Sequence, residues 1–335
     1  MEYFNNHKKL FVTATSLFIL LTLLVCIFPA LDNQKNYEPL PNAKPLSKEA
    51  EMGKAIFISE GCVACHTQQV RNIDMDKSWG KRPSIAADYT GISRTDIWRN
   101  TATLMGTERT GPDLTNIGTR QPSTEWNLTH LYNPRILVKE SIMPSYPWLF
   151  EIKENTLPTD IVVTVPDEYL PSKHTKIVAS EKALHLIAYL QSLVQVDLPE
   201  ATPQPVFLYK REPKPAKSTS GDEEEELDGA PLYANNCQMC HQANGEGLKG
   251  AFPALKDSKI VLDDDKPETM VDIIMNGYSG RVSEGYAVMP AVGVNNNLSA
   301  AEISAIMNYV KTNWGNNAQK VSSKQVEELV KQVKQ

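Results

Sequence analysis

The sequence contains the stretch Cys62-Val63-Ala64-Cys65-His66 and repeats its pattern at Cys237-Gln238-Met239-Cys240-His241. The pattern C-x-x-C-H is the attachment signature of a c-type haem. Each thiol adds across a vinyl group of the haem, and the adjacent histidine takes one axial position on the iron. The two motifs therefore predict two covalently attached haem c groups, with His66 and His241 as axial ligands and Cys62, Cys65, Cys237 and Cys240 as attachment residues.

A zinc site or a redox dithiol is the alternative interpretation of a C-x-x-C pair. A zinc site would require both pairs to share one metal, although they lie in distant parts of the sequence. Each pair also carries its own histidine at the same position. The repeated pattern therefore favours haem over zinc at both sites.

The composition limits the classes of protein that the chain can belong to. Its 335 residues are enough for two modest domains and their connections. A net charge of −6 gives no basic excess, so nucleic acid is not an expected partner. Four of the five cysteines belong to the motifs, so no pair remains for a disulfide. Aromatic residues make up only 7%, which suits a core that is partly filled by porphyrin.

An apolar run without charge extends from Leu10 to Ala30, long enough for the roughly 30 Å of a bilayer core. Lys8 and Lys9 precede it, so the positive-inside rule places the N-terminus in the cytoplasm and the rest of the chain on the outer side. A cleaved signal peptide usually has a shorter apolar region, and a lipoprotein site at Cys26 would follow a bulky Val25. We therefore expect a single-pass anchor, residues 1–31, in the bacterial cytoplasmic (inner) membrane, then a proline-containing spacer, residues 32–46. The haem domains would lie on the periplasmic side.

Residues 47–195 are expected to form the first cytochrome domain. Ser47 is a candidate N-cap for a helix that leads toward Cys62, and a second helix is predicted over 181–193. In c-type cytochromes two such helices cross, and here Gly53 would allow the close approach of Tyr189. The predicted buried stripe of the second helix consists of Leu184, Ile187, Ala188 and Gln191.

The first haem iron also needs a sixth ligand. A thioether is the usual choice in an electron carrier, because it favours Fe(II) and raises the potential. Met143 is the preferred candidate because Pro144 follows it. Three further methionines compete with it, and three histidines would give bis-histidine ligation: Met52, Met75 and Met105, and His130, His174 and His185.

Several long motifs in this part of the chain match one family. They are Glu60-Gly61-Cys62 to Gln68, Arg109-Thr110-Gly111-Pro112-Asp113-Leu114, His130-Leu131 with Asn133-Pro134-Arg135, and Glu140-Ser141 with Met143-Pro144 and Tyr146-Pro147-Trp148-Leu149. With the anchor, residues 1 to about 195 resemble the monohaem cytochrome c subunit of cbb3-type haem–copper oxidases, the CcoO or FixO type.

The resemblance implies Met143 as the axial ligand of the first haem and Pro112 as the carbonyl that orients His66. It also implies Arg135 near a haem propionate, and a haem–copper catalytic subunit with other oxidase subunits as partners. The family's Arg-Pro-Phe is not kept here, because Asn72 follows Arg71, and residues 70–105 match weakly. We expect that stretch to pack on the catalytic partner.

Residues 196–228 are rich in proline and carry an acidic run from Asp222 to Glu226, which predicts a semi-rigid, solvated linker. A flexible chain of this length samples roughly 30 Å, so the second domain would be able to swing. Residues 229–316 resemble a class I cytochrome c, with His241 and Met289 as axial ligands and Pro253 orienting His241. Met270 and Met275 lie in an apolar helical pattern and are expected in the core. The chain thus resembles a fusion, followed by a charged tail, residues 317–335.

The expected fold is mainly α: one transmembrane helix and two cytochrome c domains joined by the linker. With both irons six-coordinate, the chain has no catalytic centre of its own. The expected function is electron transfer from a donor cytochrome or another donor to a cbb3-type oxidase. A nitric oxide reductase subunit is the alternative, followed by a dihaem peroxidase and a freestanding membrane-anchored carrier.

Overall fold

The computed structural model describes residues 4–36, 39–89, 104–106, 108–208, 227–296 and 298–333. It divides into two compact units, one of residues 1–45, 85–103 and 196–203 and one of the remaining residues. We call residues 46–84 and 104–195 of the larger unit the first lobe, and residues 227–333 the second lobe. The acidic run of the linker and residues 90–103 of the weakly matched stretch lie outside the described residues.

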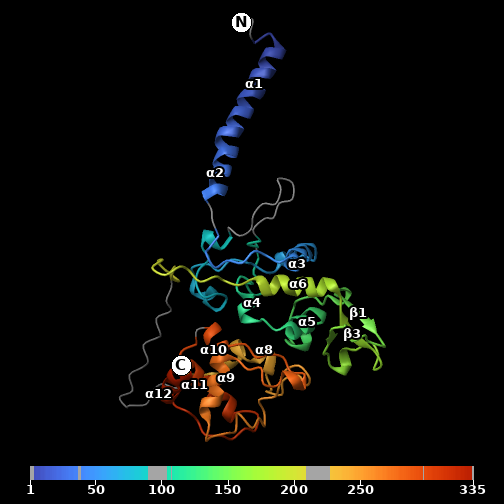
Figure 1. Cartoon of the computed structure of the whole chain (residues 1–335), viewed down its shortest axis with the longest axis vertical. Helices are drawn as coiled ribbons and strands as arrows, with labels where there is room; N and C mark the ends of the chain where they lie inside the picture. The colour runs from blue at the N-terminus through green and yellow to red at the C-terminus, as the bar shows by residue number, and fades with distance from the viewer. Residues whose placement is uncertain are drawn as a thin grey trace. The chain divides into compact units, whose positions relative to one another are not determined.

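The smaller unit carries the N-terminal helix, drawn in blue in Figure 1. It consists of α1 (His7–Leu21), a π-helical segment (Thr22–Ile27) and α2 (Phe28–Asn36). The side chain of Asn6 caps α1 by accepting a hydrogen bond from the Lys9 amide. From His7 to Asn33 the helix is long and apolar enough to cross a membrane, as the sequence predicted.

Two crossed helices form the centre of the first lobe, whose helices are α3 (Lys48–Ser59), α4 (Ile117–Arg120), α5 (Thr124–Tyr132) and α6 (Glu181–Ser192). Ser47 caps α3, as predicted. A Cβ added to Gly53 would overlap the carbonyl oxygen of His185 and lie 2.8 Å from Cβ of Tyr189. The ring of Phe57 meets the ring of Tyr189 edge-on, with 5.4 Å between centroids. The predicted close approach of α3 and α6 at glycine is therefore confirmed.

The buried face of α6 differs from the predicted stripe. The helix buries Ala183, Leu186, Ile187 and Tyr189, so only Ile187 belongs to both sets. The face that the structure buries is the one that carries Tyr189 toward α3 and Leu186 toward the cavity described below. Packing partners, rather than the apolar pattern alone, set the rotation of this helix.

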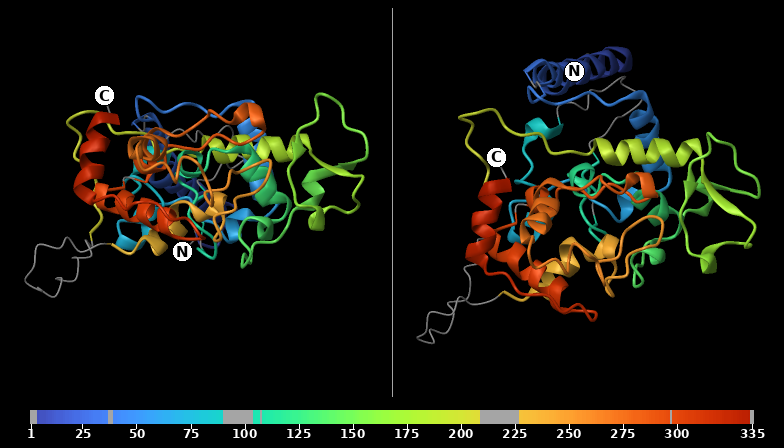
Figure 2. Two further views of the ribbon diagram at one scale, coloured as in Figure 1. Left: turned by 90° about the horizontal axis from the view of Figure 1, so that it is seen from below. Right: turned by 60° about the horizontal axis from the view of Figure 1, so that its bottom comes forward.

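A small sheet, which the sequence did not predict, lies at one end of α6 (Figures 1 and 2). Its strands are β1 (Phe150–Lys153), β2 (Val162–Val163) and β3 (Lys176–Ala179), in the order β1-β3-β2. Both pairings are antiparallel, with Phe150 opposite Ala179 and Val162 opposite Val178. Ser180 follows β3, caps α6, and donates its hydroxyl to the Leu149 carbonyl at 2.7 Å, which joins the sheet to the helix.

The second lobe is helical in its regular elements. Its helices are α7 (Gly229–Asn236), α8 (Gln238–His241), α9 (Pro267–Asn276), α10 (Val292–Asn295), α11 (Ala300–Thr312) and α12 (Ser323–Val333). A Cβ on Gly229 would overlap the carbonyl oxygen of Ala305 and lie 2.7 Å from Cβ of Tyr309. Helices α7 and α11 therefore cross as α3 and α6 do. Met270 and Met275 are buried in the core, as expected.

Helix α12 falls in the region expected as a charged tail. It packs against α9 and α11, and its residue Val326 is fully buried in the same apolar cluster as Ile303 and Met307. The amide of Val321 donates to the Asn308 side chain at 2.8 Å, and Asn308 returns a bond to the Val321 carbonyl. These bonds fix the segment just before α12 against α11. The apolar side of the charged segment thus completes the core of the second lobe.

Candidate haem-binding sites

The first attachment motif lies in a tight turn at the end of α3. Gly61 takes a left-handed backbone conformation, φ 74°, which suits glycine and lets the chain turn directly into Cys62. Cys62 is buried, whereas Cys65 is exposed. An adjacent cavity contains in its lining Cys62, His66, His130 and Met143, with Trp126 and several leucines. The structure therefore brings the predicted thiol, histidine and methionine to one cavity.

The imidazole of His66 is held in one orientation by backbone contacts. Its Nδ1 lies 2.8 Å from the Pro112 carbonyl oxygen, so the N–H donates there and Nε2 is left for a metal. A Cβ on Gly111 would overlap the ring, so only glycine fits at this position. Burial lowers the pKa of His66, although the Pro112 bond opposes that shift. The neutral imidazole, which has a free lone pair for iron, is therefore favoured.

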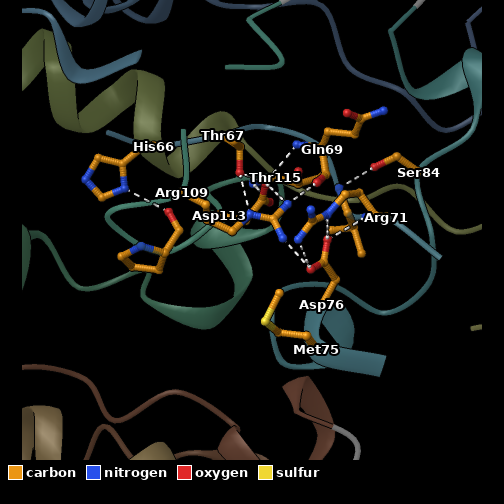
Figure 3. A network of polar contacts seen from close by, with 12 residues as sticks. His66, Thr67, Gln69, Arg71, Met75, Asp76, Ser84, Arg109, Asp113 and Thr115 are labelled. Carbon is orange, nitrogen blue, oxygen red and sulfur yellow. Dashed lines mark hydrogen bonds and ion pairs between the residues drawn. The ribbon is translucent and has the colours of Figure 1, made fainter. Parts of the chain in front are cut away.

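A buried polar network braces the backbone around His66 (Figure 3). The carboxylate of Asp113 accepts hydrogen bonds from the Thr67 hydroxyl at 2.6 Å and the Gln69 amide at 2.8 Å. Arg109 donates to Thr67 and to the Gln69 carbonyl, and its guanidinium also pairs with Asp76. Both carboxylates are fully buried. The network ties the residues after His66 to the loop that carries Pro112, so it fixes the donor and acceptor of that contact.

The segment around Met143 is fixed by two further contacts. The amide of Met143 donates to the Ser141 hydroxyl at 3.3 Å, and Arg135 donates to the Met143 carbonyl at 3.3 Å. Arg135 is exposed, and its predicted contact with a propionate stays a prediction. The competing methionines, Met52, Met75 and Met105, are exposed and are not among the lining residues of the cavity.

Two residues of α5 were missed or undervalued at the sequence level. Trp126 was not predicted as a site residue, yet it lines the cavity and is only 6% exposed. Its ring stacks on His130 at 4.4 Å between centroids, with 16° between the planes. Burial lowers the pKa of His130 to about 4, so this imidazole is neutral. Of the three alternative histidines, His130 is the one in the cavity lining, and the spacing of four residues from Trp126 on a helix was the available signal.

The second attachment motif spans the end of α7 and the short helix α8. His241 is 6% exposed, and its Nδ1 lies 2.9 Å from the Pro253 carbonyl oxygen. Burial lowers the pKa of His241 against the opposing effect of that bond. Met289 is half-buried and pairs with Tyr278 through two backbone hydrogen bonds of 2.9 Å. Gly277, with φ 79°, lies so close to the Met289 carbonyl that a Cβ would not fit.

The donor sets fit haem c better than a shared metal ion. Each lobe presents a cysteine pair and a histidine whose Nδ1 is already bonded, and the first lobe adds Met143 across an apolar cavity. Within the described residues, which include both motifs, no three His, Cys, Asp or Glu side chains gather as a metal site. The two motifs therefore do not assemble one zinc site.

Comparisons with known proteins agree with this chemistry. Residues 1–165 match the family of the cytochrome c oxidase mono-haem subunit, FixO, and residues 227–314 match the cytochrome c family. Cytochrome c-552 of Thermus thermophilus is 33% identical over 27% of this chain and 70% of its own length. Cytochrome c6 of Microcystis aeruginosa is 31% identical over 25% of this chain and 90% of its own length.

A third relative is a longer chain than this one. The alcohol dehydrogenase (quinone) cytochrome c subunit of Gluconacetobacter polyoxogenes is 30% identical over 40% of this chain and 28% of its own length. The chain thus spans well under half the length of that subunit. Taken together, the chain is a c-type cytochrome of electron transfer, with a FixO-type region at residues 1–165 and a class I cytochrome c domain at residues 227–314.

Proposed function

We propose that the chain is the electron-transfer subunit of a membrane haem–copper oxidase of cbb3 type. It receives electrons from a donor cytochrome or another donor and passes them to the catalytic subunit for oxygen reduction. The match of residues 1–165 to the FixO family carries this proposal, because that stretch includes the anchor, the first motif and Met143. The weakly matched residues 70–105 are proposed as part of the surface for the catalytic partner.

The site residues take defined roles in this proposal. Cys62, Cys65, Cys237 and Cys240 would hold the two haem groups through thioether bonds, and His66 with Met143 and His241 with Met289 would bind the two irons. When bound, haem c supplies a one-electron Fe(III)/Fe(II) couple. The Pro112 and Pro253 carbonyls keep each Nδ1 protonated, so that Nε2 is available to iron. Soft thioether sulfur favours Fe(II) and raises the potential, which suits delivery to oxygen.

The N-terminal helix supports a membrane location for the complex. The span from His7 to Asn33 would anchor the chain, with Lys8 and Lys9 on the cytoplasmic side. Both haem domains would then lie on the outer side of the cytoplasmic membrane. Alkaline phosphatase fused after residue 335 should be active if this orientation is right, and a cytoplasmic reporter should be active if it is reversed.

Purification of the tagged chain from its native membrane tests the function. We expect it to copurify with a haem–copper subunit, to contain copper, and to consume oxygen with a reduced donor. Non-haem iron in place of copper, with nitric oxide as the acceptor, would support the nitric oxide reductase alternative instead. Isolation without any partner would support the alternative of a freestanding membrane-anchored carrier. A high-spin haem signal in the half-reduced protein would support the alternative of a dihaem peroxidase.

Similarity to the quinone alcohol dehydrogenase subunit favours a second candidate function. In that case the chain would accept electrons from a dehydrogenase rather than deliver them to an oxidase. The same purification separates the two, because it would return a dehydrogenase catalytic subunit and substrate-dependent reduction of both haems. The FixO match favours the oxidase, since it includes the N-terminal helix as well as the first haem motif.

A further inference from the structure

Trp126 contacts both haem-binding sites. One face of its indole lies on His130 in the lining of the first cavity, together with His66 and Cys62. Its Nε1–H donates to the Met239 carbonyl at 3.1 Å. Met239 is the residue between the two cysteines of the second motif that directly precedes Cys240. A single buried side chain therefore links the wall of one site to the backbone of the other.

Further contacts between the lobes surround this indole. Asn295 of α10 donates to the Thr119 carbonyl in α4 at 3.0 Å. The side-chain amide of Gln121 lies 3.6 Å from the Cys240 sulfur. An apolar cluster, which we call the interlobe cluster, is buried between the lobes and contains Trp126, Leu137, Ala251 and Phe252. Its members are 1–6% exposed, so the apolar face beside the indole bond is closed to solvent.

We propose that Trp126 is a positioning residue that fastens the second lobe to the first and holds the two haem sites at a fixed separation. This inference rests on the proposed function, because a fixed separation matters only if electrons pass between the sites. Electron transfer weakens steeply with distance, so a fastened interface gives every molecule the same separation between the two sites. A freely tethered lobe would instead sample about 30 Å of positions. Trp126 provides both buried apolar area and a hydrogen bond to the Met239 carbonyl, and both are lost when the side chain is truncated.

Distance measurement on the full-length, haem-loaded chain in detergent tests the inference. Spin labels are placed at Lys182→Cys on α6 and Lys324→Cys on α12, both exposed, in a Cys26→Ser background. Pulsed electron paramagnetic resonance then reports the distance distribution between the lobes. We expect one narrow distribution in the otherwise unchanged chain. Trp126→Ala should broaden it roughly twofold or more, toward the spread of a free tether.

Matched substitutions separate the indole bond from general loss of packing. Trp126→Phe keeps an aromatic ring on His130 but loses the N–H donor and the second ring of the indole, so it should restore part of the narrow distribution. Trp148→Phe loses a comparable bond, from Nε1 to Glu60 at 2.9 Å, at an exposed position of the same lobe and should change nothing. Leu248→Asp opens the interlobe cluster from the second lobe and should broaden the distribution while leaving the first cavity intact.

Haem content and the two midpoint potentials are measured for every variant, so that a misfolded site is recognised. A broad distribution in the unchanged chain would overturn the docking. A narrow distance distribution in both Trp126→Ala and Leu248→Asp, with two haems retained, would overturn the proposed role of Trp126 and of the interlobe cluster. Neither result depends on which catalytic subunit copurifies, so failure of the oxidase assignment is seen separately in the purification and oxygen assays.

Discussion

The two lobes share the parts that contact haem and differ in the parts that brace them. Each has a glycine where two helices cross, Gly53 or Gly229, and each bonds its histidine to a prolyl carbonyl. The first lobe surrounds its histidine with a buried network of Asp76, Arg109 and Asp113 (Figure 3). The helix crossing and the His–Pro bond are therefore common to both lobes, whereas the bracing contacts are specific to each lobe.

The second lobe is braced by a different set of contacts. The ammonium group of Lys311, 1% exposed, bonds to the Val261 carbonyl at 3.2 Å and to Asp264 at 3.0 Å. Asn316 donates to the Leu255 and Val310 carbonyls, and α12 covers the core. Beside His241 itself the second lobe uses a neutral contact, in which the Tyr233 hydroxyl donates to the Gln242 carbonyl at 2.6 Å, whereas the network of the first lobe holds two fully buried carboxylates. We therefore expect the first site to be the more sensitive to loss of polar side chains.

The largest expected effect separates the two motifs by haem count. Replacing Cys62 and Cys65 with alanine should leave one covalent haem per chain after denaturation. Replacing Cys237 and Cys240 with alanine should have the same effect on the haem count. The reason is that each thioether pair serves its own haem. Pyridine haemochrome spectra measure the count, with two haems expected in the unchanged chain. Two covalent haems in either variant would contradict independent attachment.

The axial methionines should separate the lobes by potential. Met143→Ala should remove the methionine–iron charge-transfer band of one haem and lower one midpoint potential, and Met289→Ala should do so for the other haem. Axial ligands tune haem potentials over roughly 0.8 V, so each shift should be readily resolved by redox titration. If the first haem keeps its band in Met143→Ala, another ligand, such as His130 or Met105, is present.

The haem motifs were predictable because they are local in sequence. The spacing of C-x-x-C-H identifies Cys62, Cys65 and His66 before any fold is known, and the residue type of Ser47 predicts the start of α3. The mainly α fold and the crossing at Gly53 followed from the same local patterns. The structure also has the bonds from His66 and His241 to the two prolyl carbonyls, which the family resemblances implied.

What the sequence did not predict depends on contacts between distant segments. The strands β1, β2 and β3 have only two to four residues each, too few for a period-two pattern to be read. The rotation of α6 depends on Gly53 and the cavity, and burial of Val326 in α12 depends on α9 and α11. Trp126 gains its position only when α5 meets the second lobe. None of these is visible in a local window.

Among single substitutions, Asp76→Asn should have the largest effect on stability. It leaves Arg71 and Arg109 without their shared carboxylate, and breaking a buried ion pair costs about 3–5 kcal/mol. Urea unfolding of the first lobe, followed by haem absorbance, measures this. Glu327→Gln removes the exposed pair with Lys331 on α12 and should be silent. An equal effect of the two substitutions would contradict local bracing by the network.

The same carboxylate should make the first lobe sensitive to acid. Burial acts to raise the pKa of Asp76, but hydrogen bonds from Arg71 and Arg109 outweigh it, so the folded pKa lies below its ordinary value. The stabilisation is therefore complete above the unfolded pKa of about 3.9 and is lost as pH falls through the folded value. Unfolding measured from about pH 5 down to about pH 2 should show this loss in the unchanged chain and not in Asp76→Asn.

The crossing glycines should be comparably sensitive in both lobes. Gly53→Ala and Gly229→Ala each add a methyl group against a backbone carbonyl, which cannot move as a side chain can. Overpacking of this kind costs about 1–3 kcal/mol, occasionally more. Unequal costs in the two lobes would show that one crossing relaxes by shifting its helices.

The smallest expected effect concerns the helix starts, where Ser299 makes more hydrogen bonds than Ser47. Ser299 forms a full capping box, in which its hydroxyl accepts from the Glu302 amide and the Glu302 side chain accepts from the Ser299 amide. Ser47 accepts only from the Ala50 amide. Ser→Ala at either cap should cost about 1 kcal/mol. Ser299→Ala keeps the bond from the Ser299 backbone amide to the Glu302 side chain, whereas Glu302→Ala removes it. The double variant at α11 should therefore lose more unfolding free energy than Ser47→Ala at α3. Urea unfolding of the three variants measures the difference. Equal losses for the α11 double variant and Ser47→Ala would show that the reciprocal bond contributes nothing, and that both lobes begin their helices with the same strength.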